Sequence, residues 1–176
     1  MNDSRFPTVL YCVLLVLGVL QWAHAYPQLP AVMASHFSGY GVPNGWQPKQ
    51  AFFAVMALVI AVTAIPTFLA PRRLPSLPPE RINLPNKSFW LAPERREETF
   101  RFFRAQMAWF GCALLFLLLY TTSQAINANL PSIGRFDWQG MWYALGGFVI
   151  FCIVWLIHLL RHFQNVPESG ISSSSR

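Results

Sequence analysis

The chain has 176 residues, of which 54% are hydrophobic and 11% are charged. A soluble domain carries roughly 25% charged residues, so this composition argues against a water-soluble protein and for one that lies in lipid. The net charge of +6 indicates attraction to anionic lipid headgroups, and we expect no nucleic-acid partner because no nucleic-acid-binding module is recognisable.

Four apolar segments are each long enough to cross a bilayer as a helix, since a span needs roughly 20 predominantly apolar residues. They lie at about residues 7–25, 51–70, 105–126 and 141–160. Solid apolar runs are typical of helices, whereas the strands of a membrane barrel alternate over shorter segments. The sequence therefore predicts an all-α membrane protein, a four-helix transmembrane bundle within one domain, residues 1–165. The composition of residues 166–176 predicts a disordered tail.

The end of the first segment allows a second interpretation. Ala23, His24 and Ala25 resemble the small-x-small cleavage site of a secretory signal, and cleavage there would leave three spans. The weakly basic start of the chain and the bulky Trp22 beside the site favour a retained helix.

Residues 26–50 connect the first two spans and are rich in turn-forming residues. The Asn44–Gly45 pair favours a type I′ hairpin turn, with residues 33–37 and 45–47 as the two arms. We therefore expect a small hairpin-like cap between the first two helices, held against the helix ends by hydrogen bonds from His36.

The second span carries alanines at offsets of three and four, a pattern that lets another helix approach closely. These residues are Ala54, Ala57, Ala61 and Ala64. We expect this face to be buried in the bundle. Pro66 follows near the end of the span, where it is expected to kink or terminate the helix.

The loop after the second span is rich in proline from residue 71 to residue 85, which predicts an extended, polyproline-like chain along the membrane surface. Pro93 then has the position of a first helical residue, and Glu94, Glu97 and Glu98 follow in the first turns, where the helix dipole favours acidic side chains. We expect this helix to be continuous with the third span.

Lys and Arg are distributed unequally between the connections. Eleven lie in the amino-terminal tail, the loop at residues 71–104 and the carboxyl end, whereas only Lys49 and Arg135 lie in the other two connections. Basic residues concentrate on the cytoplasmic side of a membrane protein, so both termini and the long loop are expected inside and the cap outside.

Candidate chemical sites are few. His158 and His162 stand one helical turn apart at the end of the fourth span, as a two-ligand metal face would, but a nearby carboxylate is lacking. His24 and His36 would bind a metal, or act as acid and base, if they met each other or Asp137. We favour structural roles for all four histidines and expect no metal, no cofactor and no catalytic group. The spans also lack the Asp, Glu or Lys that a coupled transporter usually carries.

Two segments together resemble a known family. The first covers about residues 8–70, and its motif residues are Leu29, Pro30, His36, Phe37, Gly41, Pro43, Asn44, Trp46 and Lys49. The second, residues 83–99, includes Asn83, Pro85, Trp90, Pro93, Glu94, Arg95 and Arg96. Both are similar to segments of the bacterial membrane family called domain of unknown function 1648, the first through a Leu-Pro, a His-Phe, a Gly-x-Pro-Asn turn and a Trp-x-x-Lys.

The resemblance implies a multi-pass protein of the bacterial inner membrane and does not imply a reaction. The family includes the immunity membrane protein of the sporulation-delay toxin system, which has an additional carboxyl-terminal domain not recognised here. We therefore expect a non-enzymatic protein of an interaction, immunity or regulatory type, whose partner is a peptide or a regulatory protein. The alternatives are an oligomeric carrier or channel component for a small solute and, third, a surface enzyme acting on lipid or peptide.

Overall fold

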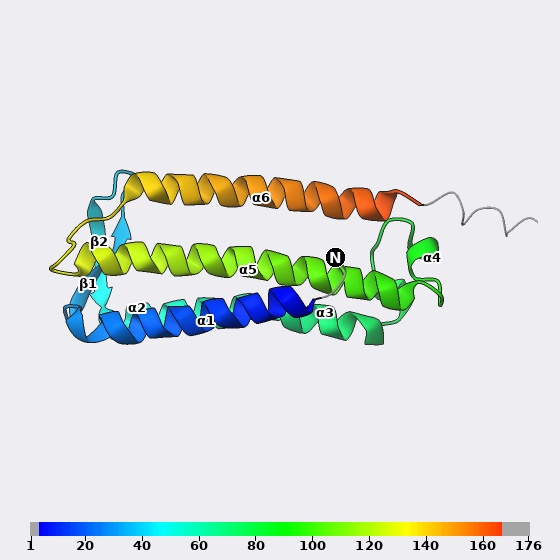
Figure 1. The fold of residues 1–176 in the computed structure, drawn as a ribbon, viewed down its shortest axis with the longest axis horizontal. Helices are drawn as coiled ribbons and strands as arrows, with labels where there is room; N and C mark the ends of the chain where they lie inside the picture. The colour runs from blue at the N-terminus through cyan, green and yellow to red at the C-terminus, as the bar shows by residue number, and fades with distance from the viewer. Residues whose placement is uncertain (1–3, 167–176) are drawn as a thin grey trace, which may run out of the picture.

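The computed structural model describes residues 4–166 and contains four long helices that lie side by side (Figure 1). They are α1 (Arg5–Ala25), α2 (Lys49–Ala64) with its helical extension to Ser76, α5 (Arg96–Asn129) and α6 (Trp138–Gln164). All four are long and apolar enough to cross a membrane, and each contains the whole of a predicted span. Apart from Val166, the predicted tail at residues 166–176 lies outside the described residues.

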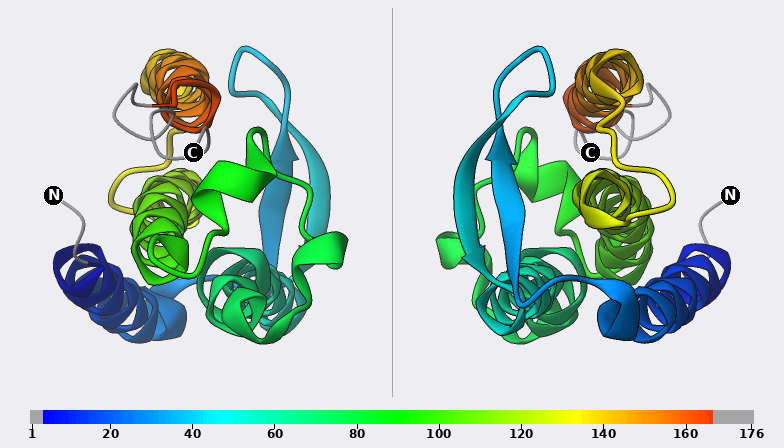
Figure 2. Two further views of the ribbon diagram at one scale, coloured as in Figure 1. Left: turned by 90° about the vertical axis from the view of Figure 1, so that its right-hand side faces the viewer. Right: turned by 90° about the vertical axis from the view of Figure 1, so that its left-hand side faces the viewer.

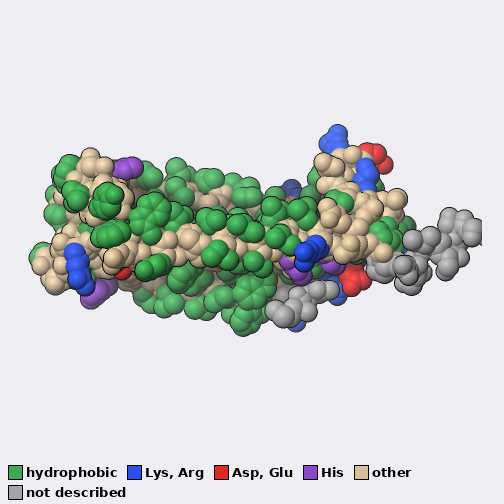
Figure 3. Space-filling model, turned by 90° about the horizontal axis from the view of Figure 1, so that it is seen from above, with side chains coloured by type: hydrophobic (Ala, Val, Ile, Leu, Met, Phe, Trp, Pro, Cys, Tyr) green, Lys and Arg blue, Asp and Glu red, His purple; other side chains and the backbone are tan. Residues whose placement is uncertain are grey.

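α5 is the central helix of the bundle. End-on views show α1, α2 and α6 arranged around it (Figure 2). Small residues on α5, including Ala105, Ala108 and Gly111, are buried and let its neighbours approach closely. A Cβ atom added at Gly111 would lie 2.8 Å from the Phe68 ring and 3.0 Å from Thr67, so a side chain there would displace the second helix. Space-filling shows hydrophobic side chains over most of the length of the molecule (Figure 3).

The second helix does not end at Pro66. It passes through a π turn, η2 (Ile65–Leu69), then α3 (Ala70–Arg73) and a 3-10 turn, η3 (Leu74–Ser76). A π turn widens the helix locally and accommodates a proline that lacks the usual N–H donor. Of the two outcomes predicted for Pro66, a kink or termination, termination is therefore wrong.

The proline-rich segment is less extended than predicted. Besides α3 and η3 it forms a second 3-10 turn, η4 (Pro79–Arg81), and the short helix α4 (Lys87–Trp90) follows. Each of the first three turns has proline at its first or second position, where the missing N–H would be unpaired anyway. α5 begins at Arg96, three residues after Pro93, and continues without a break through the third span as expected.

The prediction that the alanine face of α2 is buried is wrong. Ala54, Ala57 and Ala61 are exposed, and only Ala64 is half-buried. Aromatic pairs keep α1 and α2 apart: Trp22 contacts Phe53 at one end, with ring centroids 5.2 Å apart, and Tyr11 contacts Phe68 at the other, at 4.4 Å. Ala57, Ala61 and Ala64 therefore line a groove of about 320 Å³ beside α1.

Candidate functional site

The cap is a two-stranded antiparallel hairpin, β1 (Val32–Phe37) and β2 (Pro43–Pro48), preceded by a 3-10 turn, η1 (Tyr26–Gln28). Its turn lies at residues 38–42, where the Ser38 amide donates to the Val42 carbonyl at 2.8 Å. The prediction of a turn at Asn44–Gly45 is wrong, since both residues lie within β2. The hairpin extends from the start of α2 toward the start of α6 (Figure 2).

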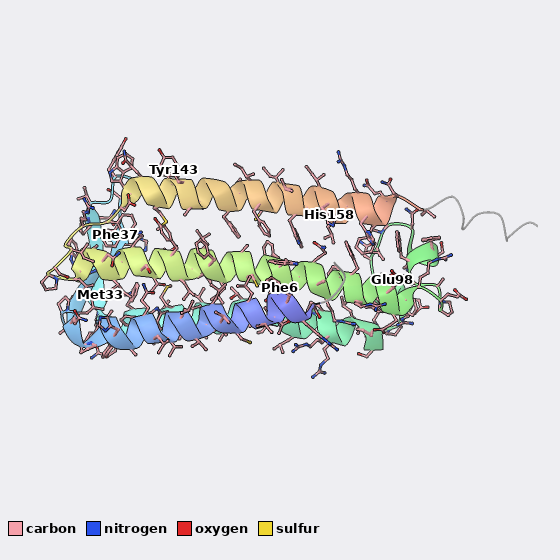
Figure 4. All side chains as sticks on the ribbon, viewed as in Figure 1. Phe6, Met33, Phe37, Glu98, Tyr143 and His158 are labelled. Atoms are coloured by element: carbon pink, nitrogen blue, oxygen red, sulfur yellow. The ribbon has the colours of Figure 1, made fainter. Side chains whose placement is uncertain are left out.

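Two apolar side chains fix the cap on the helix ends. Leu29 is 4% exposed and Met33 is fully buried. Both belong to a cluster formed at one end of the bundle with Ala25, Phe52, Phe53, Ala125 and Ile126. Figure 4 shows Met33 and Phe37 at this end of the molecule. Leu29 therefore has a structural role in the motif.

Polar side chains that sequence reasoning largely missed hold the cap backbone. The Asn129 side chain accepts from the Ala34 amide and donates to the Ala34 carbonyl, both at 2.8 Å. The Lys49 ammonium donates to the Tyr26 and Leu29 carbonyls, both at 3.0 Å. The motif identified Lys49, whereas Asn129 lies 95 residues from Ala34 and no local pattern pairs them.

The tip of the hairpin contacts the start of α6. The Trp142 indole donates to the Gly39 carbonyl at 3.0 Å, and the Phe37 ring stacks on Phe136 with centroids 4.4 Å apart. Gly41 has a φ of +78°, and a Cβ atom there would lie 3.2 Å from both Phe136 and Trp138. The turn geometry and the close contact both require glycine at this position of the motif.

The remaining motif residues of the cap include several exposed side chains, of which His36 and Trp46 have groups suited to binding. Ala34 pairs with Trp46, whereas His36, after a bulge in β1, pairs with Gly45. Because Gly45 and Trp46 are neighbours in β2, the side chains of His36 and Trp46 project from different faces of the hairpin. The cap surface, defined as the side chains of Val32, His36 and Trp46, is exposed, with 62% of Trp46 accessible. Pro30, Pro43 and Asn44 are exposed beside it.

The prediction that hydrogen bonds from His36 hold the cap against the helix ends is wrong. Its side chain is exposed, and no hydrogen bond joins it to another residue in the range 4–166. Its close neighbour is Gly45, where an added Cβ atom would lie 2.8 Å from the His36 Cβ. Asn129 and Lys49 make the bonds that were assigned to His36, so the His36 ring is available to a partner.

The second motif segment binds the end of α6 through Asn86 and Trp90, which together are called the clamp. The Trp90 indole donates to the Phe163 carbonyl at 2.9 Å, and the Asn86 amide donates to the carbonyls of Phe163 and Gln164 at 3.1 and 2.8 Å. The last carbonyls of a helix have no N–H donor within the helix, and the clamp supplies the missing donors. Asn86 has a φ of +50°, which asparagine tolerates better than most residues.

Two arginines of this segment also have structural contacts. Arg96 donates to the carbonyls of Pro75 and Leu77, at 3.1 and 2.9 Å, and so fixes the proline-rich chain beside α5. The Arg95 guanidinium lies over the Phe89 ring at 3.9 Å. The other motif residues of the segment, Asn83, Pro85, Pro93 and Glu94, are exposed.

The histidines do not converge on a common site. His24 contacts Gln28, and Asp137 caps α6 by accepting from the Gly140 amide at 3.0 Å. The His162 ring is stacked between Phe102, at 3.7 Å, and Trp90, at 4.8 Å. Across residues 4–166, no group of three or more His, Cys, Asp and Glu side chains is placed to hold a metal ion. Cys12, Cys112 and Cys152 are free thiols.

An apolar groove of about 510 Å³ lies between α1 and α6 over the middle of α5. Leu10 and Leu14 form one wall, and Gly147 and Phe151 contribute to the other. An added Cβ atom at Gly147 would contact nothing within 4 Å, so this part of α6 is open. The groove is typical of a surface covered by lipid chains or by another apolar helix.

The four helices, the cap at one end and the clamp at the other define a protein of the multi-pass membrane class. Residues 13–62 match the family model described as Domain of unknown function (DUF1648). The match spans most of α1, the whole cap and most of α2, and it confirms the family resemblance of the first motif segment. No curated protein and no solved structure matches the chain.

Proposed function

We propose that the protein is a non-enzymatic, multi-pass protein of the bacterial inner membrane that recognises another molecule through the cap surface. The observation that supports this proposal is that some residues of the motif fix the cap on the helices whereas others are exposed and available for binding. Leu29, Gly41 and Lys49 hold the cap in place, whereas the side chains of His36 and Trp46 are exposed and make no hydrogen bond within residues 4–166.

Burial of the exposed Trp46 side chain by a partner would contribute favourable free energy to binding. Fully burying a tryptophan removes about 150 to 250 Å² from water, so covering the accessible 62% of Trp46 would contribute about 2 to 4 kcal/mol. Tryptophan is also enriched among the residues that dominate binding energy at interfaces. The exposed His36 ring of the same hairpin adds a hydrogen-bonding group, and an envelope-active peptide is the kind of partner that offers both contacts.

The proposed orientation places the cap outside and the clamp in the cytoplasm, with both termini inside. It rests on the charge asymmetry, because eleven of the thirteen Lys and Arg residues belong to the proposed inner side. In the space-filling view, basic side chains gather at the end near α4 (Figure 3). This basic end would contact anionic lipid headgroups and would also be the surface available to a cytoplasmic regulatory protein.

The cap proposal is tested with Trp46→Ala and His36→Ala proteins expressed in a deletion strain. Tyr143→Ala is the matched control, because Tyr143 is 80% exposed on α6 and lies outside the cap. We expect both cap variants to lose rescue of the deletion phenotype at normal expression, and the control to keep it. A photoreactive residue at position 36 should also crosslink the partner in native membranes. Full rescue by both cap variants would refute a functional cap surface.

Orientation is tested separately by labelling single cysteines in a protein whose three native cysteines are replaced by alanine. Asn44→Cys and Glu94→Cys place the thiol at exposed positions on opposite ends of the bundle. We expect a membrane-impermeant maleimide to label position 44 in intact cells and position 94 only after lysis. The reverse labelling pattern would place the cap in the cytoplasm and the clamp outside, and would contradict the proposed orientation.

An oligomeric carrier or channel component is the second candidate. The exposed alanine face of α2 favours it, because small side chains allow a helix of another subunit to pack closely. This candidate predicts solute flux in liposomes that contain the purified protein. Flux that is the same with and without protein, at every loading, would exclude it.

A further inference from the structure

The clamp end of α6 carries a hollow that the proposed function does not use. It measures about 560 Å³ and is lined by Trp90, Val154, Ile157, His158, Arg161, His162 and Asn165. Figure 4 places His158 at this end of α6, and Figure 3 shows a basic side chain beside histidines there. The hollow therefore combines a cationic part and an apolar part.

The lining is ordered along the helix axis. Ile157 and His158 each lie three or four residues from both Val154 and Arg161, so the four side chains form one stripe on α6. The apolar pair lies toward the middle of the helix, and the cation lies toward its end. Trp90 also lines the hollow, and indole rings prefer the interface between membrane and water.

Arg161 is free to take an anionic partner. Its side chain is exposed, and no carboxylate within residues 4–166 forms an ion pair with it. Glu98 lines the adjoining hollow on the far side of the Trp90 and His162 rings. Arg161 is therefore the fixed positive charge of the stripe, with His158 and Asn165 as further hydrogen-bonding groups.

The carboxyl end of a helix normally disfavours an anion, because its unpaired carbonyls carry partial negative charge. Here the carbonyls of Phe163 and Gln164 already accept bonds from Asn86 and Trp90. The clamp thus reduces the repulsion that an anion beside Arg161 would otherwise meet.

We propose that this hollow binds an anionic membrane phospholipid, with the phosphate on Arg161 and His158 and an acyl chain along Ile157 and Val154. The proposal rests on the membrane placement proposed above and is independent of the cap. A lipid is favoured over free phosphate because the apolar part of the stripe continues directly from the cationic part. Lipid bound here would bridge α6 and the loop that carries Trp90.

The test measures binding of phosphatidylglycerol and phosphatidylcholine to the full chain, purified in detergent, by native mass spectrometry. Arg161→Gln removes the fixed charge, and Arg135→Gln is the matched control with the same charge change in an exposed loop at the cap end. Recovery of the protein in the membrane fraction, together with the cap rescue assay, reports on the proposed function separately.

We expect Arg161→Gln to weaken phosphatidylglycerol binding about fivefold, the effect of one basic residue at an anionic surface, and Arg135→Gln to leave it unchanged. Ile157→Ser should also weaken binding, since it removes the apolar contact and keeps the charge. Equal binding by the Arg161→Gln and Arg135→Gln proteins would overturn the site. Displacement of phosphatidylglycerol by inorganic phosphate, with no effect of Ile157→Ser, would overturn the lipid assignment.

Discussion

Replacing Asn129 with alanine should release the cap from the bundle. The amide of Asn129 makes two hydrogen bonds to Ala34, which is only 6% exposed, so neither backbone group of Ala34 has easy access to water once the bonds are lost. An unpaired buried polar group costs about 1 to 3 kcal/mol. We expect cap docking to weaken by about 2 to 4 kcal/mol, or roughly 30- to 900-fold in the local opening equilibrium.

Hydrogen–deuterium exchange of the detergent-solubilised protein measures this opening directly. Exchange should accelerate in peptides covering residues 30–48 and stay slow in the middle of α5. Asn127→Ala is the matched control, because Asn127 is also half-buried near the end of α5 and has no hydrogen bond to the cap. If the two variants exchanged equally over the cap, Asn129 would not be the residue that holds the hairpin.

Three further substitutions test other contacts. Gly41→Val should destabilise the cap by about 1 to 3 kcal/mol because a branched side chain at positive φ is strained, and the readout is faster exchange at residues 38–42 relative to Gly39→Ala. Lys49→Met should cost about 1 to 3 kcal/mol because two carbonyl bonds are lost, and a thermal midpoint equal to that of the wild type would contradict the contact. Trp90→Phe should loosen the end of α6 by about 1 kcal/mol because only the indole bond to Phe163 is lost, and unchanged exchange at residues 158–166 would count against the clamp.

Errors in the sequence-based predictions share one cause. The Asn44–Gly45 pair is locally suited to a turn, but the hairpin turns at residues 38–42, directly after the Phe37 ring that stacks on Phe136. Burial of Met33 and Leu29 fixes the strand register, and local preference yields to it. Likewise, the alanine stripe is locally suited to close helix packing, but bulky aromatic pairs at both ends hold α1 away.

Roles within the motif were only partly accessible from the sequence. The resemblance identified Lys49 and Trp90 as notable residues, but it gave neither of them a bonding partner. Lys49 binds carbonyls about 20 residues earlier, and Trp90 binds a carbonyl 73 residues later. Only the folded chain separates the residues that build the cap from those that remain available on its surface.

The sequence alone determined the number of long apolar helices and the approximate extent of each. That information is local, because about 20 apolar residues without charge meet the requirement for a span wherever they occur in the chain. The tertiary structure decided which face of α2 is covered, where the hairpin turns and which motif side chains face outward. Those outcomes depend on how side chains from distant segments pack against one another, and no short stretch of sequence contains all of the residues involved.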